Sequence, residues 1–402
     1  MSTRITELAT RIAVNTAKVD DYLAANSLPA PLFDIDAPVQ SQIPNAELDI
    51  AAARQAVIHD AEELRQLMLG PREQLFSYRP NHLLSQLVIV RFGLASLIPI
   101  DGEATFAGLI AAAGLGEAHV RKIVRHAMTQ HIFCEPRPGV VAHTAISRLL
   151  AEDADVAAWA RWSADDCWLA AYYTCEAMAR WPASEEPNET GFALANDTNL
   201  GMFDFLAAHP EPAARIAAGM RLYAARPDLD VRHLVDAWAW GDLPTGATVV
   251  DVGGSHGEAA LALARAFPSL KLVVQDIDAL TIRAADASKP ADGGSRVRFM
   301  THDFFIEQPV VGADALIPAL KPGARVILND VVVPGPGDST AGSAAAIRSD
   351  DLNMTMLFNA SDREMTGWAR LFEVASLGFH FEGGRQPPGS GLWVMVAEWK
   401  GV

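Results

Sequence analysis

Residues 248–260 read TVVDVGGSHGEAA, and residues 272–277 read LVVQDI. The first stretch begins with β-favouring residues, passes through a glycine-rich turn and continues into an Ala/Leu-rich helical pattern. This order predicts a strand, a glycine turn and a helix, followed by a second strand that ends at Asp276. An acid in that place can accept hydrogen bonds from both ribose hydroxyls, and the free N–H groups of a helix N-terminus attract polar ligand groups. The pattern therefore indicates a site for an adenosine-containing ligand.

The spacing of the glycines separates two classes of such ligands. Dinucleotide folds carry G-x-G-x-x-G, whereas this chain has Asp251, then Gly253 and Gly254, then Gly257. A carboxylate directly before the turn would repel a pyrophosphate, but it can hold the ammonium group of an amino-acid ligand. No Lys-Ser/Thr pair follows the glycines, which excludes a P-loop. The chemistry points to S-adenosylmethionine.

With these residues in place, the sequence resembles the class I small-molecule O-methyltransferases of the plant caffeate and fungal secondary-metabolite type. The resemblance covers nearly the whole chain. Besides the glycine turn, it rests on VQDI at 274–277, RVRFMTHDFF at 296–305, LKPG at 320–323 and REMTGW at 363–368. It implies that Gly253 and Gly257 line the cofactor, that Asp276 holds the ribose, and that Asp303 and Phe304 meet the adenine. The predicted cofactor set is Asp251, Gly253, Gly254, Gly257, Asp276, Asp303 and Phe304.

Alternation of strand and helix signals over residues 246–402 predicts an α/β fold with a Rossmann-like sheet and a terminal antiparallel hairpin. Strands are expected at 248–252, 272–276, 296–301, 325–333, 378–382 and 393–399. Residues 1–150 are predicted to be a mainly helical domain with a winged helix, whose wing is the hairpin at 132–142. In the resembled family this module packs two subunits together, so the resemblance implies a homodimer. Residues 151–245 are predicted to form a helical region around the substrate pocket.

Composition narrows the function further. The 402 residues carry a formal net charge of −17 and three cysteines without a C-x-x-C pair. Strong acidity argues against nucleic acid and against an anionic membrane surface, although Arg121, Lys122 and Arg125 lie on the predicted recognition helix. The apolar segment 83–100 is interrupted and too short to span a bilayer comfortably. The absence of an apolar signal segment and of paired cysteines suits the cytoplasm. No His/Asp/Glu cluster has metal-ligand spacing, so no metal is expected.

Aromatic and Met residues are unusually frequent between residues 162 and 220. Such stripes at helical spacing are often core, but ligand pockets are also apolar clefts with few polar groups. Met220 and Met356 coincide with positions where members of the resembled family grip a flat aromatic substrate, which favours the pocket interpretation. The predicted substrate-binding set is Trp168, Tyr172, Met202, Phe205, Met220 and Met356.

The family's general base has no counterpart here. Methyl transfer to a phenol needs a base near the acceptor oxygen, and the family supplies a His just past the fourth strand, oriented by two acids. Those acids correspond to Asp330 and Glu364, the predicted catalytic residues. The His itself is absent, because only residues 315–320 remain between Asp314 and Lys321 of the LKPG motif, too few for a strand and crossover. Three explanations stay open: a segment not represented in this chain, a natural or gene-model deletion, or a rewired domain.

Other histidines are weak substitutes for that base. His256 lies in the glycine turn, His302 alternates away from its ligand-facing neighbour, and His209 precedes a proline at a helix start. Three functions are therefore carried forward. The first is an S-adenosylmethionine-dependent O-methyltransferase acting on a phenolic or polyketide-like metabolite. The second is a methyltransferase-like pericyclase, and the third is a catalytically degenerate dimeric binding protein.

Overall fold

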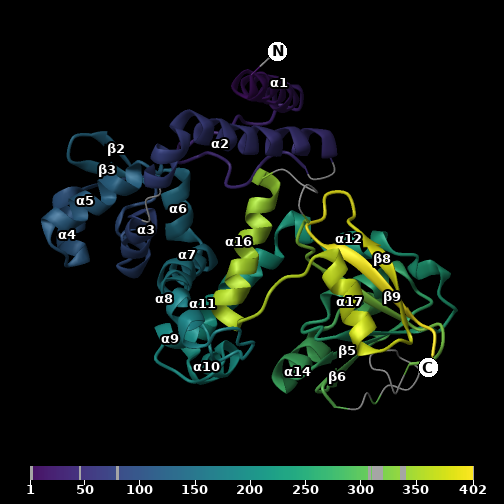
Figure 1. Ribbon diagram of the computed structural model, residues 1–402. Helices are drawn as coiled ribbons and strands as arrows, with labels where there is room; N and C mark the ends of the chain where they lie inside the picture. Colours follow the sequence, from purple (N-terminus) through teal and green to yellow (C-terminus); the bar gives the residue numbers. More distant parts are fainter. Residues whose placement is uncertain are drawn as a thin grey trace. The chain divides into compact units, whose positions relative to one another are not determined.

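The computed structural model describes residues 3–44, 47–77, 81–306, 309, 320–335 and 341–401. The chain forms two compact units (Figure 1). Unit 1 comprises Met1–Ala225 and Ser339–Ser361, and unit 2 comprises Arg226–Asp338 and Asp362–Val402. These units group the chain by packing, so the division at residues 150 and 245 remains a prediction about functional regions. In the described part of the chain, no helix is both long and apolar enough to cross a membrane.

Unit 1 is mainly helical. Its longer helices are α1 (Arg4–Ala25), α2 (Leu48–Ser77), α3 (Asn81–Arg91), α5 (Glu117–Met128), α8 (Trp168–Arg180), α11 (Pro210–Ala224) and α16 (Ala341–Phe358). Its shorter helices are α4 (Phe106–Ala113), α6 (Ala145–Glu152), α7 (Ala154–Arg161), α9 (Gly191–Ala195), α10 (Met202–Ala208), the 3₁₀ turn Ala95–Leu97 and the π-helix Trp162–Cys167. Helix α2 bends at Gly70, because this residue has a non-helical φ of 69° and the next residue is Pro71.

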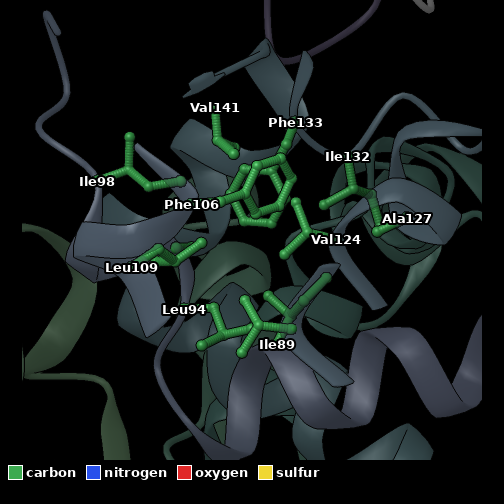
Figure 2. Packing of buried hydrophobic residues seen from close by; sticks show 12 residues of the cluster. Ile89, Leu94, Ile98, Phe106, Leu109, Val124, Ala127, Ile132, Phe133 and Val141 are labelled. Carbon is green, nitrogen blue, oxygen red and sulfur yellow. The ribbon is translucent and has the colours of Figure 1, made fainter. Parts of the chain in front are cut away.

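A small antiparallel sheet lies within the first half of unit 1. Its strands, in the order β1 (Glu103–Thr105), β3 (Val140–Ala142) and β2 (Cys134–Arg137), include the predicted hairpin. The sheet and helices α3 to α5 enclose a core in which Phe106, Phe133 and Val124 meet (Figure 2). This core shows why the apolar segment 83–100 is so hydrophobic: α3 ends at Arg91, and Leu94 and Ile98 continue into the same core from the following turn.

Helix α16 comes late in the sequence but packs in unit 1. It contacts α2, α8 and α9 (Figure 1), and its residues Met356 and Leu357 are buried there with Phe192 and Phe205. The sequence therefore leaves unit 2 after β7 and returns to it before α17.

The described residues of unit 2 form two three-stranded sheets. The first has the parallel order β4 (Thr248–Val252), β5 (Lys271–Asp276), β6 (Val297–Thr301), and the second has the antiparallel order β7 (Arg325–Asp330), β9 (Trp393–Trp399), β8 (Phe379–Arg385). The helices and turns of this unit are Pro227–Leu229, α12 (Arg232–Ala237), Trp240–Asp242, α13 (Glu258–Ala266), α14 (Ala279–Ser288), α15 (Ala291–Gly294) and α17 (Met365–Ala375). All six predicted strands and the terminal antiparallel hairpin are confirmed, which establishes the α/β fold.

Each sheet of unit 2 is covered by its own helices. Helix α13 packs against all three parallel strands, and its Ala260 and Leu263 are buried against Leu272 and Val274 of β5. Helix α17 packs against β8 (Figure 1), where Trp368 is buried with Met395 of β9. The middle strands β5 and β9 each bury four consecutive residues, as expected for strands covered on both faces, and an apolar stripe on each helix completes the two layers.

Candidate functional site

The glycine turn is fixed onto the end of the neighbouring strand. The amides of Gly253 and Gly254 both donate to the carbonyl oxygen of Gln275, at 2.8 and 3.1 Å. Gly253 and Gly257 have φ values of 73° and 77°, and Gly257 is the N-cap of α13. A left-handed conformation at these two positions strongly favours glycine. The sequence therefore folds here into a tight turn with the N-terminus of α13 directly behind it.

Asp276 lies at the same edge of the sheet as the turn. One carboxylate oxygen accepts the Ser255 N–H and the other accepts the Asp278 N–H, each at 3.1 Å. These two bonds fix the carboxylate beside the turn and leave each oxygen with a further acceptor site. Two adjacent ribose hydroxyls are donors of the matching kind. The donor and acceptor chemistry at Asp276 thus fits the predicted cofactor.

Asp303 and Phe304 follow the adjacent strand β6. Because Asp276 pairs with Thr301 in the parallel register, these residues belong to the same carboxyl edge as the turn. The Asp303 carboxylate accepts the Phe305 N–H at 2.9 Å, and the Phe304 ring is 43% exposed. An exposed ring beside a carboxylate offers a stacking face and an acceptor for an adenine with its exocyclic amine.

Asp251 lies inside the turn. A β-carbon placed on Gly254 would lie 2.6 Å from the carboxyl carbon of Asp251, so the carboxylate packs directly beneath that glycine. Burial raises the pKa of Asp251, and a hydrogen bond from the Ala260 backbone N–H only partly offsets this. Within the described structure its Oδ2 is buried without a hydrogen-bond partner. The group is therefore available as the acceptor for an ammonium, but it faces the interior side of the turn.

The two predicted catalytic acids lie in unit 2. Asp330 is the last residue of β7, and its carboxylate accepts the Val331 N–H at 2.7 Å. Burial raises its pKa, more than the hydrogen bond and the nearby Arg363 lower it. Glu364 is exposed at the N-cap of α17. The segments that carry them are joined, because the Val333 N–H donates to the Arg363 carbonyl at 2.9 Å and the Trp368 indole donates to the Val331 carbonyl at 3.3 Å.

The three histidines considered as substitutes for the family base differ in their contacts. His209 lies against the Phe205 ring, with 3.8 Å between centroids, and its Nδ1 is 2.7 Å from the Phe205 carbonyl oxygen. His256 is exposed and contacts the Ser255 hydroxyl at 3.1 Å. His302 is buried, and its Nε2 lacks a partner among the described atoms. The segment 310–319, where the loss of a strand and of the family His is predicted, lies outside the described residues.

The predicted substrate residues divide into two groups. Met202, Phe205 and Met356 meet in one buried apolar cluster, together with Trp162 and Phe192. Tyr172 and Met220 are instead exposed, at 75% and 46%, and Trp168 is half-buried outside this cluster. Residues from the second and third quarters of the chain are thus joined to α16 in one buried apolar cluster.

A cavity of about 750 Å³ lies within unit 2, between its two sheets. It is lined along their whole lengths by β4 on one side and by β7 on the other. Leu234, Trp238 and Leu263 form part of its apolar wall, and Asp251, Phe304 and Asp330 also line it. This wall is not predicted from the sequence; a local signal for it is the WAW run at residues 238–240, which residues 241–247 separate from β4.

Three comparisons define the relatives of this protein. A family model described as an O-methyltransferase domain matches residues 192–319. The chain is 38% identical to the O-methyltransferase pyvH of Aspergillus violaceofuscus (strain CBS 115571), and the alignment covers 100% of both chains. A crystal structure of OxaC in complex with SAH and oxaline matches with a TM-score of 0.71 and 20% identity, over 99% of this chain and 100% of that one. A structure described as a pericyclic reaction enzyme matches with a TM-score of 0.68 and 18% identity, over 96% and 99%.

The Rossmann-like sheet and the glycine turn that ends beside Asp276 define a class I S-adenosylmethionine-dependent methyltransferase fold. Within that class, the chain belongs to the O-methyltransferase family. The alignment with the Aspergillus relative runs over 429 positions, whereas this chain has 402 residues. The relative therefore carries positions that have no counterpart in this chain.

Proposed function

We propose that this protein binds S-adenosylmethionine and transfers its methyl group to an oxygen of a phenolic or polyketide-like metabolite. The observation that carries the proposal is the position of Asp276, whose carboxylate is fixed beside the glycine turn by the Ser255 N–H. The full-length relationship to an O-methyltransferase supports the same reaction class.

The cofactor would supply an electrophilic methyl group carried on a sulfonium. Asp276 would accept the two ribose hydroxyls, Asp303 would accept the adenine amine, and the exposed Phe304 ring would cover one face of the base. Gly253, Gly254 and Gly257 would let the turn approach the cofactor closely. Asp251 would receive the ammonium group, which would place a positive charge beside a carboxylate whose buried Oδ2 has no hydrogen-bond partner among the described residues.

The acceptor is proposed to be flat and apolar. Met202, Phe205 and Met356 form a buried cluster of aromatic and thioether groups, and methionine adapts its shape to aromatic ligands. Proximity between the acceptor oxygen and the methyl donor would then be the main source of rate. Asp330, whose pKa is raised by burial, is the acid best suited to hold a proton at the acceptor.

A second candidate function is a pericyclic rearrangement without methyl transfer. The observation that favours it is the absence from the sequence of the family His, whose loss would slow methyl transfer more than it would slow a reaction that needs only a shaped pocket. The likeness to a pericyclic reaction enzyme concerns the fold. The third candidate is a binding protein that retains the cofactor or substrate site without turnover.

Unit 1 is proposed to hold two subunits together, as a dimer in the cytoplasm. Large apolar side chains on α1 and α2 are exposed in the single chain, among them Val14, Met68, Leu75 and Phe76, and such patches mark interaction surfaces. The wing hairpin and α5 are proposed to belong to this interface and not to contact DNA. In support, Arg121 is paired with Glu117, and Arg125 is paired with Glu135.

Turnover with a panel of phenols, hydroxyquinones and unsaturated polyketides separates these functions. Purified protein, S-adenosylmethionine and each acceptor are incubated, and products are analysed by mass spectrometry. Gain of one methyl group supports the first proposal, whereas an isomer of unchanged mass supports the pericyclic alternative. Saturable binding of an acceptor without formation of either product would support the third candidate, a binding protein without turnover. The Asp330→Asn variant, with His380→Gln on the exposed outer strand as control, tests whether Asp330 takes part.

A further inference from the structure

The two sheets of unit 2 face each other with open edges. Strand β4 is hydrogen-bonded to β5 and strand β7 to β9, and among the described residues neither has a strand partner on its other side. Both open edges line the same cavity of about 750 Å³, from Thr248 to Val252 and from Arg325 to Asp330. Each edge presents a row of backbone N–H and C=O groups to this space. An unpaired strand edge is a template for another strand.

We call the part of the cavity between β4 and β7 the slot. Helix α12 and the residues around it hold both of its sides in place. On one side, the Arg385 guanidinium of β8 donates to the Ala237 carbonyl at 2.6 Å, and the Gly391 N–H donates to the Asp228 carbonyl at 2.7 Å. On the other side, Leu234 and Ala237 of α12 are buried against α13, which packs on β4 and β5. The two sheets are therefore tied to one common support, and the slot between them does not depend on contact between their edges.

One wall of the slot is apolar. Leu234, Trp238, Trp240, Leu243 and Leu263 line it from α12, α13 and the segment between them. Val249 of β4 and Ile327 of β7 pack against the same hydrophobic cluster. Because side chains alternate along a strand, a strand in the slot would turn every second side chain towards this wall. Apolar β-branched residues at these alternate positions would bury the most apolar surface.

We propose that the slot is an acceptor site for one extended peptide strand of about six residues, with β-branched apolar side chains on one face, that pairs with β4 and β7 at the same time. The lengths of the two edges, five and six residues, set the length of the peptide. Binding of this kind gains affinity from main-chain hydrogen bonds and specificity from alternate side chains.

The slot is lined in part by Asp251, Phe304 and Asp330, which also belong to the proposed cofactor and acceptor site, so peptide binding is measured without S-adenosylmethionine and without any turnover. The probe is a fluorescein-labelled peptide TVTVTV with blocked ends, in which the valines share one face. Its binding to the full chain is measured by fluorescence anisotropy. Two N-methylated forms remove the N–H donors of either the threonines or the valines. Consecutive residues of a strand direct their N–H groups to opposite edges, so each form loses the donors of one edge.

Pairing with both strands predicts that both N-methylated peptides bind at least about tenfold more weakly than the parent, since each loses three backbone hydrogen bonds. The expected result with Ile327→Lys, which places a charge on the apolar wall, is a similar loss. The control His380→Lys changes an exposed residue of β8 and should bind the parent peptide within about twofold. The N-methyl comparison uses the unaltered chain, so it decides the matter even if Ile327→Lys does not fold.

Three results would overturn the proposal. One is failure of the parent peptide to bind. Another is equal binding by all three peptides, which would indicate nonspecific apolar contact. The last is a loss confined to one N-methylated form, which would indicate addition to a single edge. Sedimentation under the same conditions identifies the competing occupant, because a dimer that excludes the peptide would mean that a second copy of the chain fills the slot.

Discussion

The carboxyl group of Asp251 lies directly beneath Gly254, so that a β-carbon on the glycine would lie 2.6 Å from the carboxyl carbon and from Oδ2. The same carboxyl is buried and has an oxygen without a partner among the described residues. Such a group is unfavourable in the free protein, because an ionised carboxylate loses hydration without full compensation. Storing an unfavourable charge beside a ligand site is a pattern expected where the ligand brings the opposite charge.

Replacing Asp251 by Asn should make the free protein more stable at neutral pH and weaken cofactor binding. Burial raises the pKa of Asp251 in the folded state above its unfolded value. The ionised form therefore destabilises the fold as pH rises through that pKa, and the gain from Asn should shrink in acid, as the carboxyl becomes protonated in both states. Melting temperatures at pH 7.5 and pH 4, with exposed Asp286→Asn as control, measure this. A variant that melts lower than the parent at pH 7.5 would contradict it.

Gly253 and Gly257 form a matched pair for testing the turn. Both have positive φ, 73° and 77°, but only a β-carbon on Gly257 would clash, at 2.8 Å from the Phe299 ring and 3.0 Å from Val274. Gly253→Ala should cost roughly 1–2 kcal/mol for the left-handed conformation alone. Gly257→Ala should lose about 1–3 kcal/mol more, because the added methyl overpacks the core. Urea unfolding of both variants gives the difference, and equal losses would show that the contact with Phe299 is not tight.

Two arginines on helix α11 differ in burial. Arg215 forms two hydrogen bonds with Asp166, at 2.9 and 3.0 Å, and the two side chains are 13% and 10% exposed. Arg221 forms a similar pair with Asp155, but it is 61% exposed. Arg215→Ala should destabilise unit 1 by about 3–5 kcal/mol, because it leaves a buried carboxylate alone. Arg221→Ala should cost less than about 1 kcal/mol. Denaturant midpoints check this ranking, and a reversed order would refute it.

His143 should make unit 1 sensitive to mild acid. The ring is buried, with Nε2 3.1 Å from the Ile98 carbonyl and Nδ1 3.0 Å from the Ser147 hydroxyl. Burial lowers the pKa of His143 in the folded state, so the unfolded chain takes up the proton first. The stability that neutral His143 contributes to the fold is complete above the pKa of this histidine in the unfolded chain, and it is lost as pH falls below that pKa. His143→Gln should therefore reduce the fall in melting temperature between pH 7.5 and pH 5, whereas exposed His380→Gln should leave it unchanged.

The strands of unit 2 could be predicted because their signals are local. The β-favouring run before Gly253, the acid at Asp276 and the Gly/Pro-rich turn before β9 each lie within a few residues of what they determine. The pairing of these strands is not local. The short segment after Asp314 predicts loss of a central strand, and that segment lies outside the described residues. Among the described residues, the strands of unit 2 group into two three-stranded sheets, and no local signal fixes this grouping. The distance between the two sheets depends on the hydrogen bond from Arg385 to the Ala237 carbonyl, which no sequence pattern predicts.

The candidate site divides in the same way. Asp276 could be placed beside the turn because parallel strands end at one edge. The inward position of Asp251 could not, since it depends on how closely Gly254 approaches it. Aromatic and Met content predicts an apolar region between residues 162 and 220, but helix phase decides that Phe205 is buried and Tyr172 exposed. The addition of Met356 to that region depends on the return of α16 to unit 1.

Calorimetric titration with S-adenosylmethionine and with SAH tests the central claim most directly. The account predicts saturable one-site binding, weakened at least about a hundredfold by Asp276→Ala, which removes two charge-assisted hydrogen bonds to the ribose. Asp286→Ala, which changes an exposed acid of α14, should bind like the parent. A folded protein that binds neither compound would contradict the account.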